Sequence, residues 1–368
     1  MSDKKKINIL MISSSSNLGG GTKHMFMLGS NLKRQFKIFY AFPQNNNFIE
    51  DLNSEYYIQI SERRLSFKDI IKLKKFIKLN SIDIIHSHGK GAGAIGRFVR
   101  LLVNKPLIYT FHGIHLKCHN WNSRLIYLIY EFLLGWIDSK KILVSNSEKK
   151  YAIKSKIYLG NKSLIVNNGV SNKNIKNFEN SNHKNDQIFK FSKITVVTVC
   201  RFVDQKNIKE ILKIAFQLSN INFYIVGNGP LWKEINYLIL KNNLKNVFLP
   251  GEKKDIFKYL YSADIYLSTS FYEGLPISIL EAMSVGLPII ASDVIGNCDT
   301  IVSGQSGYLY KLNDVKDAVL KIKKLSERDD LRKKLGHAAF ERQRYLFSKE
   351  IMIKKYTNLY RNLLTLER

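Results

Sequence analysis

Two carboxylates, Glu273 and Glu281, interrupt the apolar segment FYEGLPISILEAMSVGLPIIASD at residues 271–293. Because an unpaired charge in an apolar helix is costly, we expect both to serve a ligand; the alternative for Glu281 is an exposed position on a surface helix. Gly274 permits a tight turn, and Pro276 suits the first position of a helix. The N-terminus of that helix would offer free backbone N–H groups and partial positive charge to a diphosphate. Glu281, one turn further, could accept hydrogen bonds from two sugar hydroxyls.

A second pair of groups, Arg201 and Lys206, lies in CRFVDQKN, directly after another apolar run. Two cations at the carboxyl end of a strand can clamp a diphosphate through charge-assisted hydrogen bonds. In a chain this rich in lysine the pair alone is weak evidence. Together with the acidic segment at 271–293, it predicts a diphosphate site.

Glycines and histidines also follow apolar runs. The glycine loop Gly19–Thr22 lets a ligand approach the backbone closely, although it is neither G-x-G-x-x-G nor a P-loop. His86 and His88 alternate on one strand and share a face, which permits a metal, but no third ligand is evident and no metal is expected. His112, in TFHG, is the histidine we expect to contact a substrate; the alternative is a structural role.

The pattern of apolar runs predicts two parallel sheets with helical crossovers. A first series of runs lies at 7–15, 36–42, 82–88, 106–113 and 141–147. A second series lies at 193–202, 221–229, 247–251, 263–270 and 286–293. The Asn/Lys-rich stretch 171–187 between them is typical of a linker.

We therefore expect an α/β protein of two doubly wound, Rossmann-like domains facing a central cleft. The predicted N-terminal, acceptor domain spans residues 1–180, and the predicted donor domain spans residues 188–347. Residues 348–368 are predicted to form a helix that packs back on the first domain.

Composition narrows the class of protein. The chain has 368 residues, 45% of them hydrophobic, which excludes a disordered protein. Its three cysteines are widely spaced and fit neither a disulfide framework nor a zinc motif, so we expect a reducing, cytoplasmic setting. The apolar run 7–12 is too short for a signal peptide. The longest apolar run, 125–137, is interrupted by Glu131, so no membrane-spanning helix is expected.

The net charge of +28 calls for an acidic partner or surface. The basic excess is heavier in the first half of the chain. Residues 66–80 read as an amphipathic basic helix that could lie on anionic lipid headgroups at the inner face of the plasma membrane; the alternative is an ordinary solvated helix face. No nucleic-acid-binding motif is present, so nucleic acid is not an expected partner.

Taken jointly, these motifs resemble the retaining glycosyltransferases of family four, which have the GT-B fold. The family's E-x7-E motif matches Glu273 and Glu281 in EGLPISILEAMSVGLPIIAS, and its R-x4-K motif matches Arg201 and Lys206. The glycine loop, TFHG, NNGV and VGNGP follow in the family's order. The HSHGKGAGAIGR and YTFHG segments look most like transferases that build bacterial capsule, exopolysaccharide or lipopolysaccharide. One departure is GNCD at 296–299, where relatives often carry Gly-Gly-x-x-Glu.

The resemblance implies a role for each matched residue. Arg201 and Lys206 would neutralise the diphosphate of a UDP- or GDP-sugar in place of a metal, so no cofactor is expected. Glu281 would hold the ribose, and Glu273 would contact hydroxyls of the donor sugar. His112 would lie near the transferred sugar. The backbone groups expected to line the nucleotide-sugar are those of Gly20, Gly21, Gly227, Asn228, Gly229, Gly274, Leu275 and Pro276.

The resemblance further implies transfer of a hexose or N-acetylhexosamine, with retained anomeric configuration, to a glycan or lipid-linked acceptor. The alternative function is a basic membrane- or nucleic-acid-binding protein on the same fold that has lost catalysis. The intact motifs around Glu273, Glu281, Arg201 and Lys206 favour the enzyme.

Overall fold

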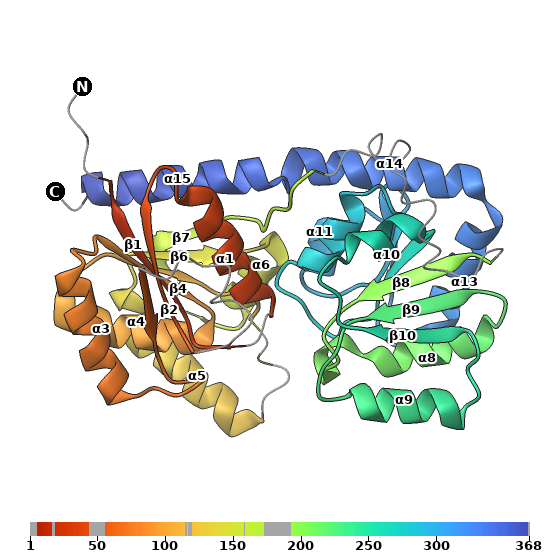
Figure 1. Cartoon of the computed structure of the whole chain (residues 1–368), viewed down its shortest axis with the longest axis horizontal. Helices are drawn as coiled ribbons and strands as arrows, with labels where there is room; N and C mark the ends of the chain where they lie inside the picture. The colour runs from red at the N-terminus through yellow and green to blue at the C-terminus, as the bar shows by residue number, and fades with distance from the viewer. Residues whose placement is uncertain are drawn as a thin grey trace. The chain divides into compact units, whose positions relative to one another are not determined.

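The computed structural model describes residues 6–16, 19–43, 56–114, 116, 120–157, 159–172 and 193–366. The chain divides into two compact units: unit 1 is Met1–Asn167 with Met352–Arg368, and unit 2 is Asn168–Ile351. Each unit contains one parallel sheet with helices on both faces (Figure 1). The prediction of two Rossmann-like α/β domains is confirmed.

The sheet of unit 1 has seven parallel strands in the order β3-β2-β1-β4-β5-β6-β7. These are β1 (Asn8–Ser13), β2 (Lys37–Phe42), β3 (Tyr57–Gln59), β4 (Ile84–His88), β5 (Leu107–Thr110), β6 (Lys140–Leu143) and β7 (Ser163–Ile165). Ile9 of β1 pairs with Ile38 of β2 on one side and with Ile84 of β4 on the other. The strand order reverses between β1 and β4, and ligands of such sheets bind at the carboxyl ends beside that reversal.

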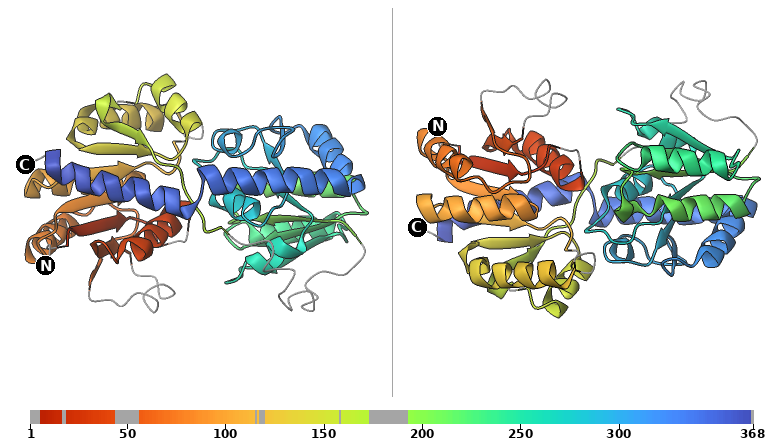
Figure 2. Two further views of the ribbon diagram at one scale, coloured as in Figure 1. Left: turned by 90° about the horizontal axis from the view of Figure 1, so that it is seen from above. Right: turned by 90° about the horizontal axis from the view of Figure 1, so that it is seen from below.

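Helices cover both faces of this sheet. α1 (Gly20–Leu32) and α15 (Lys349–Leu366) share a core with one face, and α3 (Phe67–Leu79) and α4 (Lys90–Val103) share a core with the other. α5 (Trp121–Leu134) lies in the layer of α3 and α4, as the view from below shows (Figure 2, right), and α6 (Asn146–Lys154) follows β6. The face of the C-terminal helix predicted to be apolar is buried in the core of unit 1 through Met352, Tyr356, Leu359, Tyr360 and Leu363.

The sheet of unit 2 repeats the same topology with six strands in the order β10-β9-β8-β11-β12-β13. These are β8 (Thr195–Val199), β9 (Asn222–Val226), β10 (Val247–Gly251), β11 (Ile265–Ser268), β12 (Ile289–Ser292) and β13 (Gly307–Tyr310). Its reversal lies between β8 and β11, so the loops after these strands are the expected ligand site.

Helices of unit 2 also form two layers. The core on one face is made with α8 (Ile208–Gln217), α9 (Trp232–Lys241) and α13 (Val315–Glu327). The other face carries α10 (Phe257–Ser262), α11 (Ile277–Met283) and α14 (Asp329–Leu346), and the short helix α12 (Asn297–Thr300) follows β12. Figure 1 shows α8 and α9 on the opposite side of the sheet from α10 and α11.

The domain boundary differs from the prediction at residue 180. Asn168 already belongs to unit 2, because its side-chain Nδ2 donates to the carbonyl of Leu275 at 2.7 Å. Val170 forms a β-bridge with Ser348 in the same unit. Most of the predicted linker, from residue 173 on, lies outside the described residues.

Three strands escaped the sequence pattern: β3, β7 and β13. All three lie at sheet edges, and each has only three or four residues. Short, partly exposed edge strands lack the continuous apolar run that marks a strand buried on both faces.

The basic helix predicted at 66–80 is α3, but its apolar face is not available to lipid. Ile70, Leu73 and Ile77 are buried in the core of unit 1. The outer side carries four exposed lysines, with Phe67 and Leu79 exposed at its two ends, so the alternative of a solvated outer face describes it better.

Within the described residues, no helix is both long enough and apolar enough to cross a bilayer. Cys200 and Cys298 are free thiols, and Cys118 lies outside the described residues.

Candidate functional site

The reversal point of the sheet in unit 2 is bridged by a lysine and a glutamate. Lys206 ends a short 3-10 turn (Asp204–Lys206) after β8, and its Nζ lies 2.5 Å from Oε1 of Glu273, which follows β11. The same carboxylate accepts hydrogen bonds from Ser270 Oγ at 2.7 Å and from Gln205 Nε2 at 3.4 Å. Lys206 and Glu273, predicted separately from two motifs, therefore form one site.

A glycine loop packs directly against the backbone beside Arg201. The N–H of Phe202 donates to the carbonyl of Asn228 at 2.9 Å. Gly227 and Gly229 have φ of +140° and +156°, and a Cβ on Gly227 would lie 1.9 Å from the carbonyl oxygen of Cys200. Only glycine fits such a contact. The VGNG loop and the loop that carries Arg201 therefore pack tightly against each other at the carboxyl ends of β8 and β9. Asn228 and Arg201 are exposed there.

Most of the segment that carries Glu281 is buried. Pro276 is the residue before the helix rather than its first residue, which corrects the prediction, and α11 begins at Ile277. Glu281 is buried on α11. The pKa of Tyr266 on β11 is raised, first by burial and also by the nearby Glu281 carboxylate. Gly274 and Leu275 are buried before the helix.

The GNCD segment lies against the same turn. Gly296 has φ of +86°, and a Cβ there would lie 2.7 Å from the carbonyl oxygen of Gly274 and 2.8 Å from Cβ of Glu273. The Glu273 N–H donates to the carbonyl of Ile295 at 3.1 Å. Gly296, the first residue of the GNCD segment that differs from the family pattern, therefore positions Glu273. Asp299 belongs to α12, and its carbonyl accepts from Arg342 at 2.9 Å.

In unit 1, two of the predicted residues are neighbours. A Cβ on Gly21, in the first turn of α1, would lie 3.2 Å from the ring of His112. Gly20 is exposed, with open space beside it. His112 has φ of +60° and is half-buried. Its turn is held by Glu148, whose carboxylate accepts from the N–H of Gly113 at 2.6 Å.

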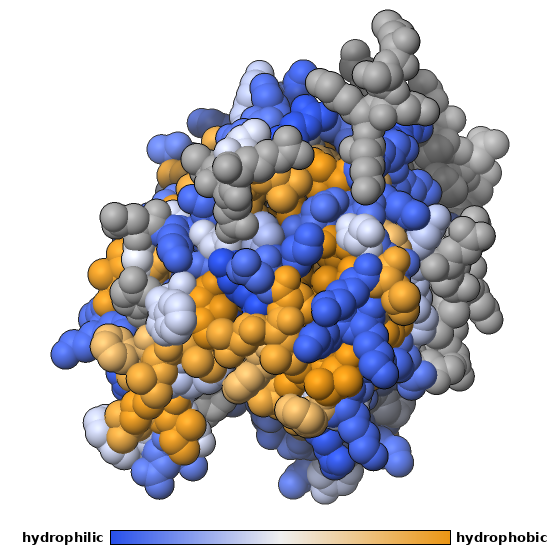
Figure 3. Space-filling model, turned by 90° about the vertical axis from the view of Figure 1, so that its left-hand side faces the viewer, coloured by the Kyte–Doolittle hydropathy of each residue, from blue (hydrophilic) through white to orange (hydrophobic). Residues whose placement is uncertain are grey.

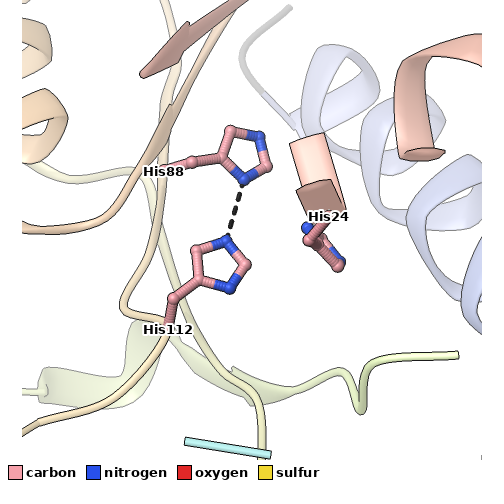
Figure 4. Close-up of side chains that lie close together, drawn as sticks. All are labelled: His24, His88 and His112. Atoms are coloured by element: carbon pink, nitrogen blue, oxygen red, sulfur yellow. Dashed lines mark hydrogen bonds between the residues drawn. The ribbon is translucent and has the colours of Figure 1, made fainter. Parts of the chain in front are cut away.

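A histidine cluster surrounds His112 (Figure 4). His88, the last residue of β4, has Nδ1 at 3.0 Å from Nε2 of His112. The ring of His24, from α1, lies against both, with ring centroids 4.7 Å from His112 and 5.5 Å from His88. In the described part of the chain, neither ring nitrogen of His24 has a hydrogen-bond partner, nor does Nε2 of His88.

Burial keeps this cluster uncharged. Desolvation lowers the pKa of His112 to about 3. It also lowers the pKa values of His24 and His88 well below 6.5, with smaller contributions from neighbouring histidines. Neutral imidazoles keep free lone pairs, so the three side chains, whose nearest ligand atoms lie within 4.8 Å of one another, could bind a metal ion or hydroxyl groups.

His86 takes no part in such a set. Its Nδ1 lies 2.6 Å from Tyr360 Oη, and its Nε2 lies 2.8 Å from Thr110 Oγ1. It fastens α15 to the sheet, and both of its ring nitrogens are engaged, so the metal pair with His88 that the sequence permitted but did not predict does not form.

Sequence reasoning missed His24 as the third histidine. The signal was present: His24 follows the glycine loop after β1, and β1, β4 and β5 are consecutive in the sheet order. Side chains that leave the carboxyl ends of three adjacent parallel strands meet at one edge.

Two sequence families match the chain. The family described as Glycosyltransferase Family 4 matches residues 18–173, and the family described as Glycosyl transferases group 1 matches residues 179–342. An uncharacterized glycosyltransferase of Methanocaldococcus jannaschii is 30% identical over 288 residues, 77% of this chain and 75% of that protein. UDP-Gal:alpha-D-GlcNAc-diphosphoundecaprenol alpha-1,3-galactosyltransferase of Escherichia coli is 28% identical over 285 residues, 73% of this chain and 74% of that protein.

Among solved structures, HepE of Anabaena in complex with UDP-glucose has a TM-score of 0.82 with 16% identity, covering 97% of this chain and all of HepE. This likeness assigns the fold as GT-B. The relative that is 30% identical, together with the two family matches, shows that the chain is a glycosyltransferase, with a Glycosyltransferase Family 4 domain followed by a glycosyl transferases group 1 domain.

Proposed function

We propose that this glycosyltransferase moves a hexose or N-acetylhexosamine from a UDP- or GDP-sugar to a glycan or lipid-linked acceptor, with retained configuration, in the synthesis of a bacterial surface polysaccharide. The observation that carries the donor assignment is the Lys206–Glu273 ion pair at the reversal point of unit 2. A cation for phosphate and a carboxylate for hydroxyls are joined where ligands of such sheets bind.

The names of the relatives support the substrate class. The Escherichia coli relative uses UDP-galactose and an acceptor linked to diphosphoundecaprenol, and HepE binds UDP-glucose. A further relative, 26% identical over 315 residues, is the capsular polysaccharide biosynthesis glycosyltransferase CapM of Staphylococcus aureus. We therefore propose that this chain, like these relatives, uses a nucleotide-sugar as donor and a surface glycan as acceptor.

The chemistry requires stabilisation of the leaving group. When the bond between the sugar and the β-phosphate oxygen breaks, negative charge grows on the nucleoside diphosphate. Lys206, with Arg201 in the same loop after β8, would stabilise that charge, which is usually the largest catalytic contribution. Glu273 would accept hydrogen bonds from the donor sugar, and Glu281 from the ribose. Neither carboxylate would act as the acid or nucleophile of a glycosidase.

Unit 1 would contribute neutral hydrogen-bonding groups. The pKa of His112 lies far below neutral pH, so its imidazole can accept as well as donate toward a sugar hydroxyl. Gly21 leaves room for the His112 ring, and Gly20, which has open space beside it, would let the diphosphate approach the backbone. His24 and His88 would hold the His112 ring in place.

We further propose that catalysis needs no metal and that the protein works on the cytoplasmic side, peripherally attached to an anionic membrane surface, without nucleic acid as a partner. The positive side chains assigned to the diphosphate support the first point. The net charge of +28 supports the second.

A thermal-shift screen against UDP- and GDP-sugars tests the donor assignment, because a ligand that binds only the folded state raises the melting temperature. We expect one nucleotide-sugar to raise the melting temperature of the wild type and not that of Lys206→Ala. Lys209→Ala is the matched control, because Lys209 is also a lysine paired with a glutamate, Glu234, but on the exposed face of α8. Equal shifts for the wild type and Lys206→Ala would overturn the assignment.

A further inference from the structure

One helix of unit 1 presents apolar side chains to the outside along its length. On α5 and the 3-10 turn that follows it (Gly135–Ile137), seven large apolar residues are exposed. We call them the α5 apolar face: Trp121, Leu125, Ile126, Ile129, Phe132, Leu133 and Trp136. Figure 3 shows apolar side chains gathered at the lower left of its view, where α5 lies. A contiguous exposed apolar surface of this kind marks an interaction site.

The inner side of α5 fixes which way this face points. Among the described residues of the helix, Glu131 alone is buried, and its carboxylate accepts hydrogen bonds from Arg97 at 2.8 and 3.2 Å. Arg97 also binds Asp138 at 2.6 and 2.9 Å. Because these charges are fully buried, rotating the helix would expose or unpair them. The outward orientation of the apolar face is therefore built into the fold.

The outward charge along this segment is positive. Between residues 120 and 141 the acidic residues are Glu131 and Asp138, and both are buried against Arg97. Lys162 donates from its Nζ to the carbonyl of Trp136 at 3.1 Å, which places a lysine beside that tryptophan. Arg124 and Lys140 lie at the two ends of the same segment. Such an arrangement complements an anionic surface and not another basic one.

The composition of the face fits the interface of a bilayer. Trp121 and Trp136 stand at its two ends, 72% and 61% exposed, and tryptophan favours the boundary between headgroups and acyl chains. The helix has 14 residues, too few to span the hydrocarbon core, for which about 20 are needed. A helix of this kind lies in the plane of the interface with its apolar side inserted.

We propose that the α5 apolar face docks unit 1 onto an anionic lipid bilayer, with Trp121, Phe132 and Trp136 as the inserted anchors and Lys140 and Lys162 at the phosphates. The purpose of docking rests on the proposed function, since a lipid-linked acceptor is held in a membrane. The docking itself follows from the surface alone.

Vesicle flotation of the full-length protein tests the proposal, with phosphatidylcholine vesicles and with vesicles of phosphatidylcholine and phosphatidylglycerol in equal parts. We expect the wild type to float with the mixed vesicles and to bind the neutral ones weakly. The double variant Phe132→Gln/Trp136→Gln should lose at least about tenfold in vesicle affinity, because two large apolar side chains no longer insert.

The matched control is Phe67→Gln/Leu79→Gln on α3, whose side chains are 76% and 84% exposed on the basic helix of the same unit. This variant should float like the wild type. Flotation of the α5 variant at wild-type level, loss of flotation in the α3 variant instead, or no flotation of the wild type would each overturn the proposal. Equal binding to neutral and anionic vesicles would overturn its electrostatic part.

Two further measurements distinguish lipid docking from self-association and from donor binding. Sedimentation velocity without lipid should show no association that the α5 variant abolishes; such an association would assign the face to a second copy of this chain and overturn the proposal. Thermal shift by nucleotide-sugars should be the same in both variants as in the wild type. If no nucleotide-sugar binds while flotation still depends on α5, the proposed function fails and the docking surface stands.

Discussion

Lys206 Nζ and Glu273 Oε1 lie 2.5 Å apart and join the loop after β8 to the loop after β11. The cation assigned to the diphosphate and the carboxylate assigned to the sugar therefore neutralise each other without a ligand. This pairing explains how Glu273 tolerates a buried position beside an apolar helix.

Replacing Lys206 by alanine should lower kcat/KM for sugar transfer by about 10²–10³, the usual loss when one preorganised donor to a developing charge is removed. Steady-state kinetics with the donor found in the thermal-shift screen measures this. Lys209→Ala, at an exposed ion pair, should retain wild-type kcat/KM. Wild-type turnover in Lys206→Ala would show that the diphosphate binds elsewhere.

Replacing Glu281 by glutamine should raise the Kd of the free nucleoside diphosphate as well as that of the donor, because the ribose is common to both. Glu273→Gln should instead weaken binding of the nucleotide-sugar and leave the free nucleoside diphosphate nearly unaffected. Titration calorimetry with each ligand separates the two. Equal effects of both variants on both ligands would contradict the assigned roles.

Removing Arg97 should destabilise unit 1, since Arg97→Met leaves Glu131 and Asp138 buried without their arginine partner. Loss of one partner of a buried ion pair costs about 3–5 kcal/mol. Denaturant unfolding of the wild type and of Arg97→Met measures this loss in the free energy of unfolding. The control is Arg328→Met, which breaks the exposed pair with Asp330 and should cost no more than about 1 kcal/mol. Similar losses in both variants would contradict the buried network.

Stability should fall as the pH drops below about 6.5. Burial lowers the pKa values of His24, His86, His88 and His112, so below that pH the unfolded chain binds protons that the folded chain does not. Each such histidine costs about 1.4 kcal/mol for every pH unit down to its folded pKa. For His112 this window extends from about 6.5 to about 3.

Melting temperatures at about pH 7.5 and about pH 5.5 measure this dependence. His24→Leu removes one buried imidazole that lacks hydrogen-bond partners in the described structure, so the drop between the two pH values should be smaller than in the wild type. If the melting temperature of His24→Leu fell as much as that of the wild type, His24 would not contribute to the pH dependence of stability.

Transfer should continue after treatment with EDTA, and the melting temperature should stay the same. His24, His88 and His112 are close enough to bind a metal, so this experiment decides their role. Loss of activity that zinc restores, together with a lower melting temperature, would assign the histidines to a metal and contradict catalysis by Arg201 and Lys206 alone.

The local sequence determined much of the fold and of the proposed donor site. Strands buried on both faces leave continuous apolar runs, so the inner strands of both sheets could be predicted, whereas the short edge strands β3, β7 and β13 could not. The motifs that contain Lys206 and Glu273 stand at strand ends, and the rule for parallel sheets brings such ends together. The glycine loop at Gly227 was also visible in the sequence.

Tertiary structure alone decided the contacts between distant segments. The apolar side of the basic helix α3 packs against the sheet, so it is not available to lipid as the sequence had suggested. On α5 the buried pair of Glu131 with Arg97 faces the core, so the apolar side of that helix faces outward. The order of the strands places His24 next to His88 and His112, whereas His86 forms a hydrogen bond with Tyr360 of α15 instead. Composition and periodicity describe each segment by itself; burial and pairing depend on which segments become neighbours, and the order of the strands in the sheet fixes that.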